Sequence, residues 1–148
     1  MPEETYNIQN HQRILITGSR AQEILENCRK VLDSQSKPYD ILTDQEQSIG
    51  SGPIVFIVSE NYADYDPHIV LIDKVNMDHR SEFEALANDL PKSGTLVYNG
   101  SDEIAKEIGS KERENIHREE YDGDDVMSAA KKLVRRIGIS EEIFNKVF

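Results

Sequence analysis

Asp78 and His79 are the pair of neighbouring side chains best suited to chemistry, because they follow an apolar run typical of a buried strand. An imidazole titrates near neutral pH, and a carboxylate can orient it for proton transfer or metal binding. Glu60, near the end of the preceding apolar run, supplies a natural further ligand. We therefore predict a metal site of Glu60, Asp78 and His79. The alternative is that Asp78 and His79 only cap the helix that follows them.

A second candidate site is the turn after the first apolar run, ILIT, where Gly18, Ser19 and Arg20 precede a helical pattern. Backbone amides and a helix amino terminus at such a turn favour anions. A phosphate loop needs a second glycine, a lysine and a hydroxyl at fixed spacing, and a dinucleotide fingerprint also needs further glycines. The segment TGSRAQE offers neither. We predict a weak anion site at most, or a purely structural turn.

The remaining polar candidates lack a shared spacing. His11, His68 and His117 are expected at the surface or at an edge of the fold. Tyr62 and Tyr65 could contact a small polar ligand or a partner protein, or they could be part of the turn before a proline. Basic residues gather near the end of the last long helical pattern, where they suit the helix dipole: Lys131, Lys132, Arg135 and Arg136.

Strands and helices alternate along the chain. Short apolar strands are predicted at 13–17, 39–42, 54–58, 68–72 and 94–98, with a weak edge strand at 115–119. Apolar residues at helical spacing predict helices from about Ala21 to Leu32, from Ser81 to Leu90, from Ile104 to a stop at Gly109, and over Asp124–Ile137. A last helix begins after Ser140, its predicted N-cap.

This alternation predicts an α/β fold, a Rossmann-like three-layer sandwich with a mostly parallel sheet of about five or six strands and helices on both faces. Residues 1–12 are polar and without periodicity, so we expect a flexible amino-terminal arm followed by a single α/β domain over 13–148. At 148 residues, the chain fits one domain with a real core.

Composition excludes several partners. The net charge of -11 opposes broad affinity for nucleic acid or anionic lipid. No stretch approaches the roughly 20 apolar residues of a membrane span, and the amino terminus lacks the pattern of a signal peptide. Cys28, the single cysteine, fits a reducing compartment. We expect a cytoplasmic protein.

A family pattern emerges from five segments in order: ILITGS, PIVFIVSENYADY, PHIVLIDKVNMDH, SEFEALANDLP and KSGTLVYNGSDEIA. Over residues 13–108 the chain resembles the central ATPase domain of the Mur ligases of peptidoglycan synthesis. In that family a loop of the form GTNGKTT follows the first strand, an acidic residue ends a later strand, and a strand ending in NxxxDH precedes a helix and a GxLVxN strand. The strongest match is Asp78-His79 with its spacing to Gly94, Leu96, Val97 and Asn99.

The resemblance implies an ATP-dependent ligase that joins an amine to a carboxylate through an acyl phosphate. His79 matches the family's metal histidine, and Glu60 lies near its metal glutamate unless a shift of two residues puts Val58 there. Lys74 stands where NxxxDH has its asparagine. The phosphate loop departs most, since Ala21, Gln22 and Glu23 replace its glycine, lysine and threonine. An acid near the β and γ phosphates is electrostatically unfavourable.

We therefore expect a degenerate, stand-alone relative of this domain, because the chain ends where the family's last domain begins and no segment for a nucleotide-sugar substrate precedes its first strand. The expected function is a noncatalytic binding or regulatory module linked by descent to peptidoglycan metabolism. The expected partner is a small molecule or protein, no cofactor is required, and a homo-oligomer is an open alternative. The second hypothesis is a residual ATP- and magnesium-dependent, ligase-like or small-molecule-binding enzyme that needs a partner chain.

Overall fold

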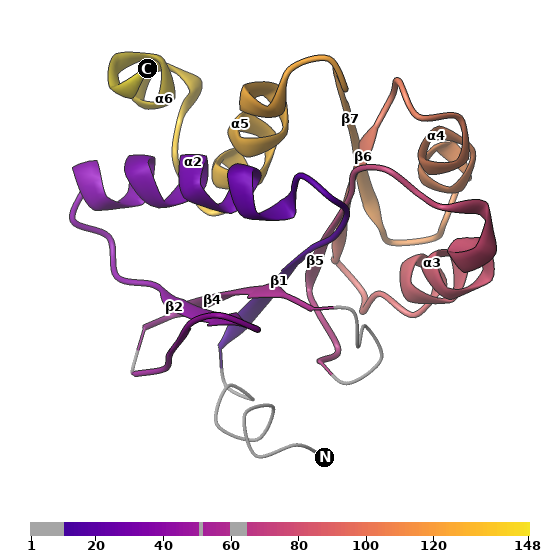
Figure 1. Cartoon of the computed structure of the whole chain (residues 1–148), viewed down its shortest axis with the longest axis horizontal. Coiled ribbons are helices and arrows are strands. Elements are labelled where there is room, and N and C mark those ends of the chain that lie inside the picture. Colours follow the sequence, from indigo (N-terminus) through magenta and orange to yellow (C-terminus); the bar gives the residue numbers. More distant parts are fainter. Residues whose placement is uncertain (1–10, 51, 60–64) are drawn as a thin grey trace.

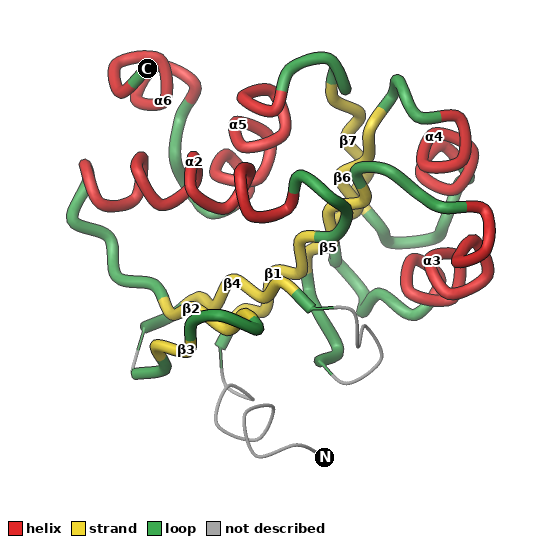
Figure 2. The backbone as a smooth tube through the Cα atoms, in the orientation of Figure 1, coloured by secondary structure: helices red, strands yellow, loops and turns green. Residues whose placement is uncertain are grey.

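A computed structural model describes residues 11–50, 52–59 and 65–148, whose strands form one seven-stranded sheet in the order β3-β2-β4-β1-β5-β6-β7 (Figure 2). Six strands are parallel, and β3 alone pairs antiparallel, with β2. The strands are β1 (Gln12–Ile16), β2 (Asp40–Thr43), β3 (Gln47–Ser48), β4 (Ile54–Val58), β5 (Ile69–Ile72), β6 (Thr95–Asn99) and β7 (His117–Tyr121).

Helices cover both faces of the sheet (Figure 1). On one face lie α2 (Ala21–Ser34), α5 (Val126–Arg136) and α6 (Glu141–Val147). On the other lie α3 (Arg80–Asn88), preceded by the short 3-10 helix η2 (Met77–His79), and α4 (Glu103–Ser110). No helix in the described segments is both long and apolar enough to cross a bilayer.

The central strands β4 and β5 are apolar throughout because both of their faces are covered. In β1 the buried side chains alternate: Ile14 and Ile16 pack under α2 and α5, whereas Leu15 packs under α3 and α4. The predicted α/β three-layer fold is confirmed. The seventh strand, β3, escaped the sequence pattern because it has only two residues, Gln47 and Ser48, and both are exposed.

Two predicted boundaries were wrong. Gly109 does not stop α4 but lies inside it, one residue before its end. The residue is a glycine because the ring of Tyr98 packs on this turn, and a Cβ at residue 109 would come within 2.1 Å of that ring. The edge strand β7 begins two residues later than predicted and reaches Tyr121, which is buried. Its first four residues, HREE, are all polar, and they hid its true extent.

The carboxyl-terminal helices complete the core, as their apolar pattern predicted. Leu133 and Val134 of α5 and Phe144 of α6 are at most 2% exposed and pack in one cluster with α2. Ser140 caps α6, since its Oγ accepts a hydrogen bond from the Ile143 amide at 3.3 Å. These helices therefore help to bury α2.

The chain reverses direction across the sheet between β1 and β5. After β1 it crosses one face through α2 towards β2, and after β5 it crosses the opposite face through α3 towards β6. The carboxyl ends of β1 and β5 are neighbours at this reversal. Open α/β sheets place ligands in the crevice at such a point.

Candidate functional site

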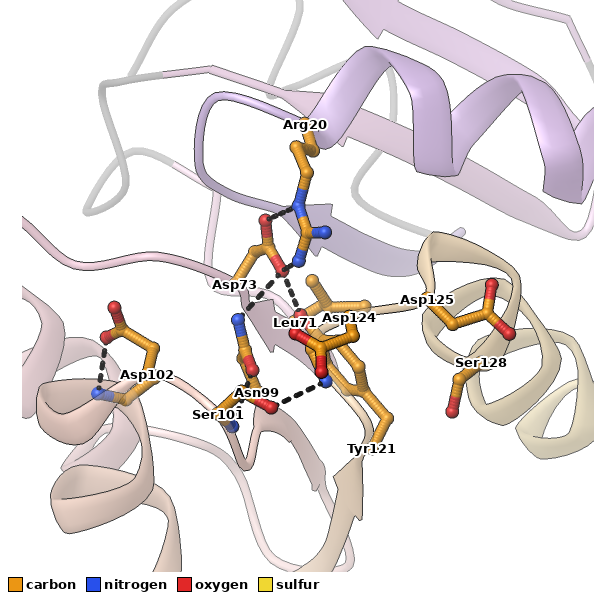
Figure 3. Close-up of polar contacts among 12 residues, drawn as sticks. Arg20, Leu71, Asp73, Asn99, Ser101, Asp102, Tyr121, Asp124, Asp125 and Ser128 are labelled. Atoms are coloured by element: carbon orange, nitrogen blue, oxygen red, sulfur yellow. Dashed lines mark hydrogen bonds and ion pairs between the residues drawn. The ribbon is translucent and has the colours of Figure 1, made fainter.

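Asp73 lies at the centre of this crevice. It directly follows β5, and its side chain is fully buried. The Arg20 guanidinium grips it in a bidentate pair, with Nε donating to Oδ2 at 2.8 Å and Nη2 to Oδ1 at 2.6 Å (Figure 3). Arg20 is itself only 20% exposed. Its hydrogen bonds to Asp73 raise the pKa of Arg20 above its usual value, so Arg20 keeps its positive charge.

Two neighbouring strands complete the hydrogen bonding of this carboxylate. The hydroxyl of Tyr121, the last residue of β7, donates to Asp73 Oδ1 at 2.5 Å, and the amide of Asn99, the last residue of β6, donates to the same oxygen at 3.4 Å. Asn99 and Tyr121 are paired in register across the two strands. Burial and the hydrogen bond to Asp73 raise the pKa of Tyr121, which stays a neutral donor.

The turn after β1 is shaped around Asp73. Gly18 has a φ of 99°, a left-handed conformation that favours glycine, and a Cβ there would lie 3.1 Å from the Cβ of Asp73. Thr17 ties the end of β1 to β5, because its Oγ1 donates a hydrogen bond to the Leu71 carbonyl at 2.8 Å. Ser19 is exposed. Of the three residues predicted as a weak anion site, Arg20 therefore binds the carboxylate of Asp73 with its guanidinium.

The loops that follow β5, β6 and β7 are joined to one another by hydrogen bonds. Asp102 caps α4 by accepting from the Ala105 amide at 3.0 Å, and it also accepts from the Val75 amide at 3.3 Å. Ser101 Oγ accepts from the Gly123 amide at 3.1 Å. A Cβ at residue 123 would lie 1.9 Å from Asn99 Oδ1, so only glycine fits there. These contacts hold the polar residues of the crevice in fixed positions.

The surrounding charge is acidic. Asp122, Asp124 and Asp125 follow β7 and are exposed, and Figure 3 shows Asp124 and Asp125 beside the crevice. Two of these carboxylates accept hydrogen bonds from nearby backbone amides. Asp122 accepts from the Asp124 amide at 3.0 Å, and Asp125 caps α5 by accepting from the Met127 amide at 2.9 Å. A polyanion approaching this edge meets more negative than positive charge.

Asp78 and His79 follow Asp73 in sequence but do not join it. The strand β5 ends at Ile72, so Asp73 takes the strand-end position, and Asp78 and His79 come only after a further turn of the chain. Asp78 and His79 form the exposed turn η2, where His79 Nδ1 lies 3.3 Å from Glu82 Oε1. Asn76, and neither predicted residue, caps this turn by accepting from the Asp78 amide at 3.0 Å.

The predicted metal set is only partly visible. Glu60 lies outside the described residues. Among the described residues, no three His, Cys, Asp or Glu side chains are grouped as a metal site would require. The site of Glu60, Asp78 and His79 stays a prediction.

The three other histidines differ in environment. The prediction for His11 was wrong: it is 9% exposed, and its Nε2 lies 2.6 Å from Oδ2 of Asp40, a buried acid at the start of β2. An isolated polar residue before a strand gives no signal of a partner 29 positions away. His117 is exposed on the edge strand β7, as expected. His68 is half-buried at the start of β5.

Tyr62 also lies outside the described residues, whereas Tyr65 packs half-buried against the cluster under α3 and α4. Of the basic residues on α5, Arg135 and Arg136 are in the last turn, as the helix dipole favours.

Sequence reasoning missed Asp73, which was hidden inside IVLIDK as one charged letter at the edge of an apolar run. The signal was available, since an acid directly after a buried strand must lie at the carboxyl edge of the sheet. Its pairing with Arg20, 53 residues earlier, was not readable from spacing.

The fold defines the class of protein that this chain resembles. It is the fold of the Mur ligases, as solved structures show at an identity too low to carry more than fold. One is UDP-N-acetylmuramate:L-alanyl-gamma-D-glutamyl-meso-diaminopimelate ligase from Neisseria meningitides, with a TM-score of 0.73, 12% identity, and coverage of 97% of this chain and 67% of that one.

A murein peptide ligase from Psychrobacter arcticus has a TM-score of 0.72 at 8% identity, over 97% of this chain and 48% of that one. UDP-N-acetylmuramoylalanyl-D-glutamyl-2,6-diaminopimelate--D-alanyl-D-alanyl ligase from Acinetobacter baumannii has a TM-score of 0.76 at 11% identity, over 97% and 47%. The chain thus spans about half to two thirds of these ligases. No family model and no curated protein matches its sequence.

Proposed function

We propose that this chain is a noncatalytic binding or regulatory module built on a Mur-ligase-like fold, with a history in peptidoglycan metabolism. The observation that carries the proposal is the bidentate Arg20–Asp73 pair at the carboxyl ends of β1 and β5. In an ATP-dependent relative, this is the place where the nucleotide's phosphates are expected.

The residues here do not fit a nucleoside triphosphate. Arg20 is the only cation of the turn, and two of its N–H groups already bind Asp73. A phosphate seated on the turn would compete with that carboxylate and lie beside its buried negative charge. A magnesium ion could offset the repulsion, but donors from Arg20, Tyr121 and Asn99 already occupy the oxygens of Asp73. The likeness to the ligases therefore supports a shared fold without a shared nucleotide site.

The test is a titration of the whole chain with Mg·ATP by calorimetry, with the amide signals of Thr17 to Arg20 followed by NMR. We expect neither heat nor saturable shifts at these residues at millimolar ATP. A dissociation constant in the micromolar range with shifts at Gly18 and Ser19 would overturn the proposal. The ligand is sought in parallel by thermal shift with muramyl peptides, because a ligand that binds the native state raises the melting temperature.

A second candidate, a metal-dependent residual enzyme, is favoured by one observation. His79 is exposed just after β5, within 3.3 Å of Glu82 and next to Asp78 in sequence. A divalent ion could use these groups together with Glu60. Titration with Mn²⁺ should then broaden the NMR signals of residues 78–82 at micromolar metal, and His79→Ala should abolish the effect. Equal broadening in both proteins would exclude this site.

A further inference from the structure

A pocket opens on the opposite edge of the sheet, where the strands begin. It has a volume of about 220 Å³ and is lined by the starts of β1, β5 and β6, the turn before β6 and the end of α5. Its lining residues are Gln12, His68, Ile69, Pro91, Lys92, Ser93, Gly94, Thr95 and Arg136. The pocket shares no residue with the crevice around Asp73.

The charge of this pocket is opposite to that of the protein. Lys92 and Arg136 line it, and none of its described lining residues is acidic, although the whole chain carries a net charge of -11. Neither cation forms an ion pair or hydrogen bond within the described part of the chain, whereas Arg20, Arg29 and Arg80 do. Two unpaired cations at one pocket create a local positive potential.

His68 adds a directed donor. Its Nδ1 accepts a hydrogen bond from the Arg13 amide at 3.0 Å, so the neutral ring must carry its proton on Nε2. Burial, followed by the nearby charge of Arg13, lowers the pKa of His68, which keeps the ring neutral at pH 7. His68 therefore lines the pocket with a ring whose tautomer, with the proton on Nε2, is fixed by the fold.

Two backbone amides that line the pocket are already hydrogen-bonded within the fold, so they are not free to bind a ligand. The amides of Gly94 and Thr95 donate to the carbonyls of Pro91 and His68. At the end of α5, the carbonyls of Val134 and Arg135 accept hydrogen bonds from the amides of residues 139 and 138. These bonds reduce the partial negative charge at this end of the helix. Binding therefore falls to the side chains of the pocket, and its only charged ones among the described residues are the cations Lys92 and Arg136.

We propose that this pocket binds a small oxyanion, a phosphate or carboxylate group, between Lys92, Arg136 and the Nε2–H of His68. Its volume is below the roughly 300–1,000 Å³ of pockets for drug-sized ligands, so it fits the anionic group of a ligand and not a whole nucleotide. The inference goes beyond the proposed function and holds whether or not the β1 turn binds ATP.

The test is an NMR titration of the whole chain at constant ionic strength with inorganic phosphate, pyrophosphate and succinate. We expect saturable shifts at Ile69, Gly94 and Thr95. Arg136→Gln and Lys92→Gln should each weaken binding about tenfold, because a hydrogen bond to a charged group is lost. His68→Asn keeps an acceptor near Nδ1 and removes the Nε2 donor, so it should also weaken binding.

Arg135→Gln is the matched control. Arg135 is the neighbour of Arg136, is exposed and lies outside the pocket, so the variant removes the same charge without touching the site. Saturation by the phosphates alone assigns a phosphate ligand, and saturation by succinate alone assigns a carboxylate. Equal affinities for Arg136→Gln and Arg135→Gln, or no saturable shift with any anion, would overturn the proposal. Shifts spread over all surface cations would mean nonspecific screening and would also overturn it.

Discussion

Arg20 and Asp73 form a buried ion pair whose removal tests how the crevice is built. Arg20→Met leaves the carboxylate of Asp73 without its cation, while Tyr121 and Asn99 still donate to it. Breaking a buried pair from one side costs about 3–5 kcal/mol, and the remaining donors and the 20% exposure of Arg20 place this case near 3 kcal/mol. Urea denaturation measures the loss.

Two variants control for this result. Arg80→Met breaks solvent-accessible pairs with Glu107 and Glu84 and should change stability by less than about 1 kcal/mol. Adding Asp73→Asn to Arg20→Met removes the uncompensated charge and should recover part of the loss. If Arg20→Met and Arg80→Met unfold at the same urea concentration, the pair does not hold the crevice together.

His68 provides a pH-dependent prediction at the same scale. Because its pKa is lowered in the folded protein, the unfolded chain binds the proton more readily between the folded value and about 6.5. His68 therefore lowers stability as the pH falls below about 6.5 and has no such effect above it. An NMR titration of the ring should give a midpoint below 6.5, and His68→Asn should flatten the slope of stability in this range. A midpoint above 6.5 would contradict the burial of this ring.

At the scale of elements, the sequence predicted the strands and helices that have a continuous apolar face. The helix α2 shows why: Ile24, Leu25 and Val31 recur at helical spacing, and all are fully buried. The segments it missed or misplaced lack that signal. Two polar residues form β3, and the polar face of β7 hides its end at Tyr121. Asp73 was missed because its partners come from other elements.

Gly109 tests the packing of α4 on the sheet. Gly to Ala inside a helix ordinarily stabilises it by about 1 kcal/mol. Here the added Cβ would meet the ring of Tyr98 at 2.1 Å, so we expect a loss of about 1–3 kcal/mol from overpacking. Thermal unfolding decides the sign. Ser110→Ala, one residue further along the helix, should be neutral or slightly stabilising, and a stabilised Gly109→Ala would show that Tyr98 moves away freely.

At the scale of the whole molecule, the apolar pattern of the last two helices predicted that they belong to the core, and in the structure they pack against α2. Leu133 and Val134 of α5 and Phe144 of α6 enter the same cluster as α2 and the strands beneath it. The covering of this face links the chain's carboxyl-terminal residues to its first helix. It is a long-range property that the apolar pattern of α5 indicated without naming its partner.

Two truncations measure how much each of these helices contributes to the stability of the fold. Removing residues 141–148 deletes α6 and the buried Phe144, and it should cost about 3–5 kcal/mol, as removal of a buried Phe side chain does, while unfolding stays cooperative. Removing residues 124–148 also deletes α5 and exposes the apolar face of α2, a loss of order 10 kcal/mol that rivals the net stability of a domain. This shorter chain should show no cooperative melting transition in calorimetry. If it instead melts at the temperature of the full chain, α5 does not stabilise the core, and its apolar face must serve a partner.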